Sequence, residues 1–304
     1  MQPRKQYWLR SLIFLVIFSY GSAFGSDSLQ LDIRKKIVVG GNIAAYSGLM
    51  SGLYFLWYSD YPMSKFHLLN DNKEWLQMDK AGHSFSCYYE GVAGIEMMKW
   101  AGYTKKQSAF IGGSYGFFIQ TGVEVLDGFS DGWGASWGDM TANTFGAGLA
   151  ISQYLLWEEQ RISLKFSYSP SPYAKFRPNT FGANFPQRLL KDYNAQTYWL
   201  SGNIKAFAPD CKIPDWLNIA VGYGADGMYG GFGNTFTSNG IDYDFTSTPR
   251  SRQFYIAPDI DLTKIKTHNK LVKTGLTILN GIKFPLPTLE YHTTEGFKAH
   301  LIQF

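Results

Sequence analysis

Between residues 79 and 157 the sequence places polar side chains in pairs inside apolar, glycine-rich segments. The pairs are Asp79 with His83, Glu124 with Asp127, and Asp139 with Asn143. Residues three or four apart share one face of an α-helix, so each pair predicts a polar patch on a mostly apolar helix. Buried carboxylates are costly unless they are paired, hydrogen-bonded or bound to a metal ion. We therefore expect three helices to pack together with their polar patches facing one another.

Two of the pairs also have ordinary structural explanations. Asp79 can cap the N-terminus of its helix and leave His83 as a hydrogen-bonded core histidine. Alternatively, the two residues can be metal ligands, or a base oriented by a carboxylate. Ser136 and Asp139 have the spacing of a capping box, which explains an acid at Asp139 without any further function. The interior Asn143 lacks such an explanation and is expected to make a specific hydrogen bond.

Glu124 and Asp127 lie at the end of an apolar helix, where negative charges oppose the helix dipole. A metal ion, a basic partner or a raised pKa would remove that conflict. The candidate cofactor is therefore one divalent metal ion. With only one histidine and no Glu-x-x-His motif, zinc is a poor fit, whereas a hard cation held by oxygens and one imidazole is compatible.

Three overlapping sets of site residues follow from these patterns. The candidate metal ligands are His83, Glu124, Asp127 and Asp139. The candidate catalytic residues are Asp79, His83, Glu124 and Asp127. The complete predicted polar cluster consists of Asp79, His83, Glu124, Asp127, Ser136, Asp139 and Asn143.

The N-terminus has the pattern of a secretory signal peptide. Three basic residues precede an apolar run from Ser11 to Phe18, and small residues near position 25 offer a cleavage site. An uncleaved membrane anchor is the alternative, although the run is short for a membrane span. Removing residues 1–25 removes three basic groups and lowers the formal charge from +4 to +1. This near-neutral charge gives no electrostatic basis for nucleic-acid binding.

The rest of the chain predicts a helical half and a β-rich half, with a boundary near residue 160. Helices are expected at 37–58, 79–100, 105–126 and 136–157, after a polar lead at 26–36. Segment 37–58 carries no charge. Its length allows it to span a bilayer, and its small residues also suit a buried central helix.

Alternating apolar and polar residues predict strands at 162–168, 196–207, 217–224 and 254–262. A loop at 225–251, a helix at 268–282 and an extended segment ending at Phe304 complete this half. A small sheet packed on the bundle and an incomplete barrel wall next to a membrane are both compatible with these strands. The predicted fold class is α+β, with an N-terminal four-helix, glycine-rich bundle (26–160) and a C-terminal antiparallel β-rich region (161–304).

The polar stretch resembles the YfiM-type family of predicted periplasmic lipoproteins, a domain family of unknown function, and is distantly similar to VanZ-like membrane proteins. The resemblance covers about residues 37–157 and rests on Asp79-Lys80-x-x-His83, Glu124-x-x-Asp127 and Ser136-x-x-Asp139-x-x-x-Asn143-x-x-Gly146. It implies a small helical bundle in the cell envelope with these residues facing one another, and it implies no particular reaction. This chain departs from the family in lacking the lipid-attachment cysteine and in adding a β-rich half.

The sequence thus predicts an uncharacterised, membrane-associated protein of the Gram-negative cell envelope, periplasmic or outer-membrane associated and exported by its signal peptide. The polar cluster is expected to be structural or ligand-binding. The alternative is a metal-dependent hydrolase acting on a lipid or cell-wall substrate. A membrane is the expected partner, nucleic acid is not, and the sequence does not indicate protein partners.

Overall fold

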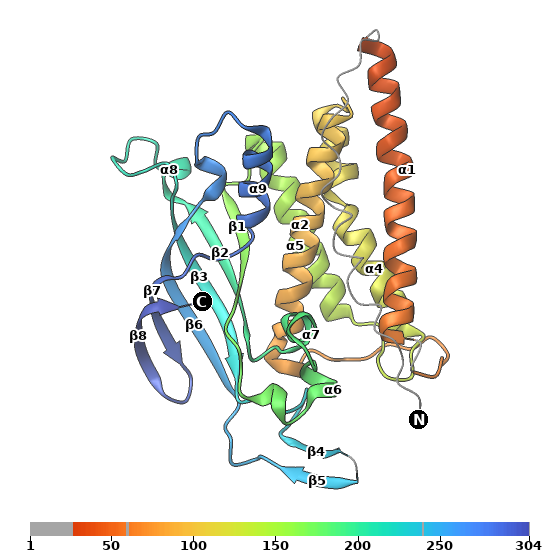
Figure 1. Ribbon diagram of the computed structural model, residues 1–304, viewed down its shortest axis with the longest axis vertical. Helices are drawn as coiled ribbons and strands as arrows, with labels where there is room; N and C mark the ends of the chain where they lie inside the picture. Colours follow the sequence, from red (N-terminus) through yellow and green to blue (C-terminus); the bar gives the residue numbers. More distant parts are fainter. Residues whose placement is uncertain (1–26, 59–60, 239, 304) are drawn as a thin grey trace.

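The computed structural model describes residues 27–58, 61–238 and 240–303, so the predicted signal peptide and Phe304 lie outside the described residues. Helices occupy the N-terminal half, and an antiparallel sheet dominates the C-terminal part (Figure 1). The fold is therefore α+β, as predicted. The helices stand together on one side of the molecule, and the sheet lies on the other side.

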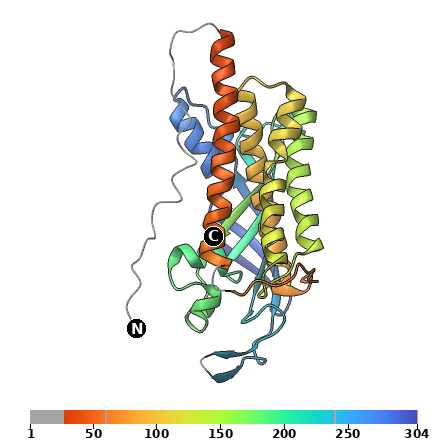
Figure 2. The ribbon, with the colours of Figure 1, turned by 90° about the vertical axis from the view of Figure 1, so that its right-hand side faces the viewer.

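The helices of the N-terminal half lie side by side (Figure 2). They are α1 (Asp27–Leu53), α2 (Met78–Trp100), α3 (Lys105–Gln107), α4 (Tyr115–Gly128) and α5 (Trp137–Trp157). Helix α2 begins one residue before its predicted start, and α5 begins one residue after Ser136. Among the described residues, no helix combines the length and hydropathy needed to cross a membrane.

Helix α1 begins well before residue 37, so the prediction of a polar lead at 26–36 was wrong. The basic side chains of this segment have aromatic partners at the end of α2 and in the turn that follows it. The Arg34 guanidinium lies 5.3 Å from the ring of Trp100, and the Lys35 ammonium lies 5.4 Å from the ring of Tyr103. These cation–π contacts hold the charged turns against the bundle, and the helix continues through them.

The helix predicted at 105–126 is divided, and the four-helix description is not confirmed in this detail. Helix α3 passes into a π-helical turn, Ser108–Gly112, and α4 follows after a short break. The turn packs tightly on α2. A Cβ atom on Gly94 would lie 2.1 Å from the carbonyl oxygen of Gly112. Only glycine allows the two backbones to come this close.

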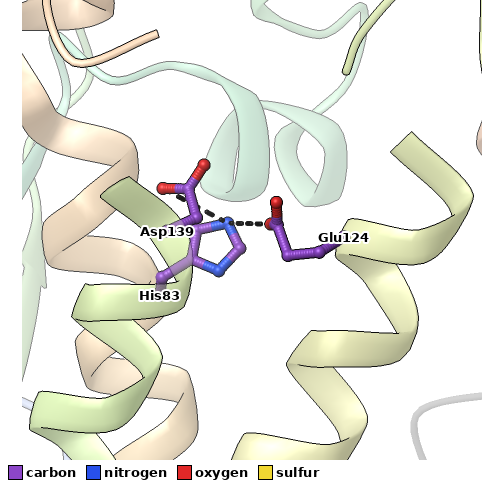
Figure 3. Close-up of side chains that lie close together, drawn as sticks. All are labelled: His83, Glu124 and Asp139. Atoms are coloured by element: carbon purple, nitrogen blue, oxygen red, sulfur yellow. Dashed lines mark ion pairs between the residues drawn. The ribbon is translucent and has the colours of Figure 1, made fainter. Parts of the chain in front are cut away.

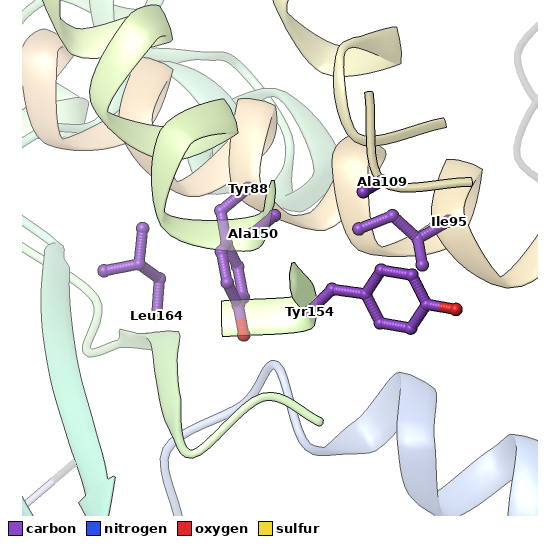
Figure 4. Packing of buried hydrophobic residues seen from close by; sticks show 6 residues of the cluster. All are labelled: Tyr88, Ile95, Ala109, Ala150, Tyr154 and Leu164. Carbon is purple, nitrogen blue, oxygen red and sulfur yellow. The ribbon is translucent and has the colours of Figure 1, made fainter. Parts of the chain in front are cut away.

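An apolar cluster joins the helices to the sheet (Figure 4). Its buried members are Tyr88, Ile95, Ala109, Ala150, Tyr154 and Leu164. They come from α2, the π-helical turn, α5 and the first strand. Because one strand contributes Leu164 to the same cluster, the two halves of the chain share a core.

The sheet has the strand order β1-β2-β3-β6-β7-β8, with every neighbouring pair antiparallel. Its strands are β1 (Ile162–Tyr168), β2 (Gln196–Asn203), β3 (Leu217–Asp226), β6 (Ser251–Ile260), β7 (Leu286–His292) and β8 (Gly296–Gln303). The predicted final extended segment is thus a hairpin of two strands. The segment before β7 returns to β1, where the amide of Phe166 donates to the carbonyl of Gly281 and the amide of Lys283 donates to the carbonyl of Phe166.

Two other predictions for this half need correction. The expected loop at 225–251 contains a separate hairpin, β4 (Thr235–Ser238) and β5 (Ile241–Asp244), which projects from one end of the molecule in Figure 1. The strand predicted to reach residue 207 ends at Asn203, because the Asn203 side chain accepts a hydrogen bond from the amide of Ala206 and caps a short helix. The remaining helices are α6 (Pro178–Phe181), α7 (Phe185–Lys191), α8 (Ile204–Phe207) and α9 (Lys270–Leu279).

The two faces of the sheet have opposite character. The side chains of Lys165, Ser201, Asp259 and Glu290 are almost completely buried on one face. Lys165 Nζ lies 2.7 Å from Asp259 Oδ2, and the Ser201 hydroxyl donates to the same oxygen at 2.6 Å. The residues that alternate with them are apolar and form the other face. The buried face of this sheet therefore carries its charged groups, beside a small apolar cluster of Trp199, Ala220, Tyr255 and Ala257.

Candidate functional site

The polar cluster forms where the N-terminal ends of α2 and α5 meet the C-terminal end of α4. Helix α2 contributes Asp79 and His83, α4 contributes Glu124, and α5 contributes Asp139 and Asn143. Two helix N-termini bring their partial positive charge to a group of acids. This arrangement offsets part of the cost of placing Glu124 at the C-terminal end of its own helix.

Ser136 connects the start of α5 to two acids. Its side chain accepts a hydrogen bond from the amide of Asp139 at 3.2 Å and donates to Asp71 Oδ1 at 2.5 Å. Its own amide donates to Glu124 Oε2 at 2.8 Å. The predicted capping box is therefore only half formed. In a full capping box the carboxylate of Asp139 would accept the hydrogen bond from the Ser136 amide, but here Glu124 accepts it.

Lys80 is the central cation of the cluster. Its ammonium lies 2.7 Å from Asp71, 2.9 Å from Asp79 and 3.0 Å from Asp139. Burial lowers the pKa of Lys80, but these carboxylates outweigh that effect and raise the pKa above its usual value. The sequence pattern contained Lys80 without giving it a role. Asp71 was missed because it lies in a connector that read as ordinary polar loop.

His83 sits between an amide and two carboxyl groups. Its Nδ1 lies 3.1 Å from Asn143 Oδ1, and its Nε2 lies 3.8 Å from Glu124 Oε1 and 4.0 Å from Asp139 Oδ1 (Figure 3). Burial lowers the pKa of His83 to about 4, so the ring is neutral at pH 7. Because the amide oxygen of Asn143 accepts from Nδ1, the proton is on Nδ1 and the lone pair of Nε2 faces the two carboxyl groups.

The acids around His83 hold their protons more strongly than exposed acids do. Burial raises the pKa of Glu124 to about 7, with a further contribution from nearby Asp127. Burial, a hydrogen bond with Asp71 and the charge of Asp79 raise the pKa of Asp139 to about 8. Glu124 Oε1 and Asp139 Oδ1 are both buried without a hydrogen bond.

Asp79 and Asp127 occupy different positions from those the patterns predict. Asp79 lies within α2 rather than capping it, because Gln77 is the N-cap residue. Burial raises the pKa of Asp79, and Lys80 offsets part of that rise. Asp127 accepts a hydrogen bond at 2.7 Å from the hydroxyl of Tyr58 at the end of the first helical segment. Burial raises the pKa of Asp127 to about 6.

Among the described residues, two groups of three ligand atoms lie within 4.8 Å of one another: His83, Glu124 and Asp139, and Asp71, Asp79 and Asp139. Asp127 belongs to neither, although it was a predicted metal ligand. The second group already surrounds the ammonium of Lys80. The first group brings together three of the four predicted ligands, and Lys80 contacts it only at Asp139.

The fold and cluster define an α+β protein with a charged core inside its helical half. A family model described as predicted periplasmic lipoprotein (DUF2279) matches residues 68–155, which is less than a third of the chain. The matched residues include every member of the polar cluster. No curated protein and no solved structure matches the chain. The family match is consistent with a place in the cell envelope and supplies no reaction.

Proposed function

We propose that this chain is a membrane-associated protein of the Gram-negative cell envelope, exported by its signal peptide and in contact with lipid through the apolar face of its sheet. The observation that supports this proposal is the layered composition of that face. The similarity to a predicted periplasmic lipoprotein family is consistent with it. The helical bundle with its charged core is then the part of the protein that resembles the YfiM-type family.

A row of aromatic side chains crosses the apolar face, one from each strand. Cross-strand pairing places in this row Phe166, Tyr198, Tyr223, Phe254, Tyr291 and Phe297. The next row is aliphatic and consists of Leu164, Leu200, Val221, Ile256, Leu289 and Ala299. Neither row contains a charged residue. An aromatic level beside an aliphatic band is the pattern that proteins present to the interface and hydrocarbon of a bilayer.

The protein itself covers only one end of this face. Helix α2 packs there, with the ring of Phe85 5.9 Å from that of Phe166 and 5.8 Å from that of Tyr198. Toward the other edge the same rows are open: Leu289 is 59% exposed and Phe297 is 85% exposed. Large contiguous apolar surfaces of this kind mark contacts with a membrane or with another protein.

The helical half adds to the exposed apolar surface. Ile43 on α1, Phe118 on α4, and Phe145 and Leu156 on α5 are all more than half exposed. A single protein partner would have to cover both the helices and the sheet, whereas a lipid phase contacts every side at once. This distribution favours lipid as the occupant of the apolar face.

Vesicle flotation of the detergent-purified protein with two arginine variants tests this proposal. Ile256→Arg places a charge in the centre of the aliphatic row, and Ser247→Arg adds the same charge in an exposed loop. An arginine on a lipid-facing strand costs about 2–4 kcal/mol near the bilayer centre, which corresponds to roughly 30- to 1000-fold weaker partitioning. We expect Ser247→Arg to float like the wild-type protein and Ile256→Arg to stay with the soluble fraction.

Two results would contradict a lipid contact. One is equal flotation of both arginine variants. The other is a stable dimer in buffer without detergent or lipid that Ile256→Arg dissociates, since the occupant of the face would then be a second copy of the chain. The cluster is poorly placed to act as the site of a metal-dependent hydrolase. A substrate would need access to the cluster, and Glu124, Asp139 and Asn143 are each at most 5% exposed.

A further inference from the structure

Three possible ligand atoms converge inside the helical bundle: Nε2 of His83, Oε1 of Glu124 and Oδ1 of Asp139. The unprotonated Nε2 of His83 faces Glu124 Oε1 and Asp139 Oδ1 at 3.8 and 4.0 Å, which is beyond hydrogen-bond distance. Both carboxyl oxygens are buried without a hydrogen bond, and their residues are 3% and 5% exposed. The ammonium of Lys80 lies beside Asp139 Oδ1 at 3.0 Å, whereas Glu124 Oε1 has no such neighbour in the described part of the chain. A buried acceptor without a donor costs about 1–3 kcal/mol, and a cation bound at Glu124 Oε1 would remove this cost.

The other oxygens of these acids are already used, which fixes the direction of the free ones. Glu124 Oε2 accepts from the amide of Ser136. Asn143 Oδ1 accepts from Nδ1 of His83 and so fixes the tautomer with Nε2 free. In metal sites, the second nitrogen of a ligating histidine is usually held by an amide, carbonyl or carboxylate in this way. Figure 3 shows the ring directed at both acids.

The separations suit a metal ion. Cations bound by protein oxygens and imidazole have ligand distances of about 2.0–2.6 Å, so neighbouring ligand atoms lie roughly 3–5 Å apart. The three donor atoms here lie within 4.8 Å of one another. The three residues come from α2, α4 and α5, so an ion bound between them would link three separate helices.

The charges around the group also favour a cation. Lys80 pairs with Asp71 and Asp79 and reaches Asp139 Oδ1 from one side at 3.0 Å. Among the described residues this pairing does not extend to Glu124, whose neighbour is the neutral ring of His83 at 3.8 Å. One lysine therefore pairs with three acids, whereas Glu124 has no cationic partner among the described residues.

We propose that His83, Glu124 and Asp139 bind one divalent cation of the Mn²⁺, Fe²⁺ or Zn²⁺ class, which joins α2, α4 and α5. One imidazole and two carboxylates form a mixed set that Mn²⁺ and Fe²⁺ accept. Zn²⁺, which the sequence pattern disfavours because of the single histidine, also binds imidazole together with carboxylate oxygens. Ca²⁺ is a poor fit because it takes six to eight oxygen ligands. The ion would stabilise the packing of the bundle. This proposal does not depend on whether the sheet contacts lipid.

Calorimetric titration of the full-length, chelator-treated protein in detergent with Mn²⁺, Zn²⁺ and anaerobic Fe²⁺ tests this site. We expect one equivalent of at least one of these ions to bind the wild-type protein and to raise its melting temperature. Glu124→Gln and His83→Gln each remove one ligand at nearly constant volume. Since loss of even an outer-sphere partner typically costs 10- to 100-fold in affinity, we expect loss of a ligand to weaken binding by at least about 100-fold.

Glu90→Gln is the matched control. Glu90 is a half-buried acid on α2 that accepts hydrogen bonds from Gln120 and belongs to neither group of ligand atoms. Its variant should bind the metal ion as the wild-type protein does. The proposal is overturned if none of the three ions binds the wild-type protein, or if Glu124→Gln and His83→Gln both retain wild-type affinity. If one ligand variant fails to fold, the other still decides the matter.

Discussion

Replacing Glu90 with glutamine should stabilise the protein at alkaline pH and have little effect at acidic pH. Glu90 lies on α2 against α4, where Gln120 Nε2 donates to both carboxyl oxygens at 3.2 Å. Burial raises the pKa of Glu90 from 4.5 to about 7, and the bond from Gln120 offsets part of the rise. The carboxyl group is therefore easier to ionise in the unfolded chain than in the folded protein.

The sign of the effect follows from proton linkage. Between pH 4.5 and about 7 the folded protein binds more protons at Glu90 than the unfolded chain does, so the free energy of unfolding falls as the pH rises. Below this window the neutral acid costs nothing, and above it the loss is complete. At about 1.4 kcal/mol per pH unit, the full loss is about 3 kcal/mol, and partial solvent contact reduces it to about 1–3 kcal/mol.

Urea unfolding in detergent micelles, followed by circular dichroism from pH 4 to pH 8.5, measures this difference. We expect Glu90→Gln to match the wild-type protein at pH 4 and to exceed its stability by about 1–3 kcal/mol at pH 8. Glu96→Gln, an exposed acid on the same helix paired only with Lys99, should change stability by less than about 0.5 kcal/mol throughout. Equal stabilities of Glu90→Gln and wild type at pH 8 would refute the reasoning.

Four other substitutions test the packing and the ion pairs by the same unfolding measurement. Gly94→Ala should destabilise the protein by about 1–3 kcal/mol, because its Cβ atom meets the backbone of Gly112. Gly148→Ala, with nothing within 4 Å of its Cβ atom, should stabilise the protein by about 0.5–1 kcal/mol. Similar values for the two variants would exclude this account. Lys80→Met leaves three acids without their cation and should cost about 3–5 kcal/mol, so an unchanged midpoint would be contrary evidence. Lys165→Met should cost about 1.5–3 kcal/mol, because the buried Asp259 loses the ammonium at 2.7 Å and keeps the more distant one of Lys283 at 3.7 Å; an unchanged midpoint would contradict this expectation.

The sequence predicted the elements that depend on local patterns. The alternation from Ile162 to Tyr168 gave β1 with its observed ends, and the turn at Thr104 gave an N-cap that accepts from the amide of Gln107. It also located the helices that carry the polar pairs. Each of these features is decided by residues within a few positions of one another, which is the range over which period and capping rules act.

The features that the sequence missed depend on contacts between distant segments. The break before α4 follows from the close approach of the Ser108–Gly112 turn to Gly94 on α2. The sequence between residues 105 and 126 does not indicate this contact. Asp71 joined the cluster through Ser136 and Lys80, which follow it by 65 and 9 positions. Asp127, close in sequence to Glu124, turned instead to Tyr58. Spacing along one helix could not decide which acid faces its neighbour.

Alternation also cannot tell which face of a strand is buried, and here that choice is the informative one. The sheet buries Lys165, Asp259 and Glu290 and exposes Ile256, Leu289 and Phe297. In water both features are unfavourable, because charges are removed from solvent and apolar surface is left in contact with it. Next to lipid the second cost becomes a gain, and the buried charges gain strength from a low dielectric once they are paired. The helical half follows the same logic, with exposed aliphatic and aromatic residues outside and Lys80 among its acids inside. Both halves of the chain therefore place charged groups inside and apolar groups outside, and this shared arrangement supports the lipid contact that we propose.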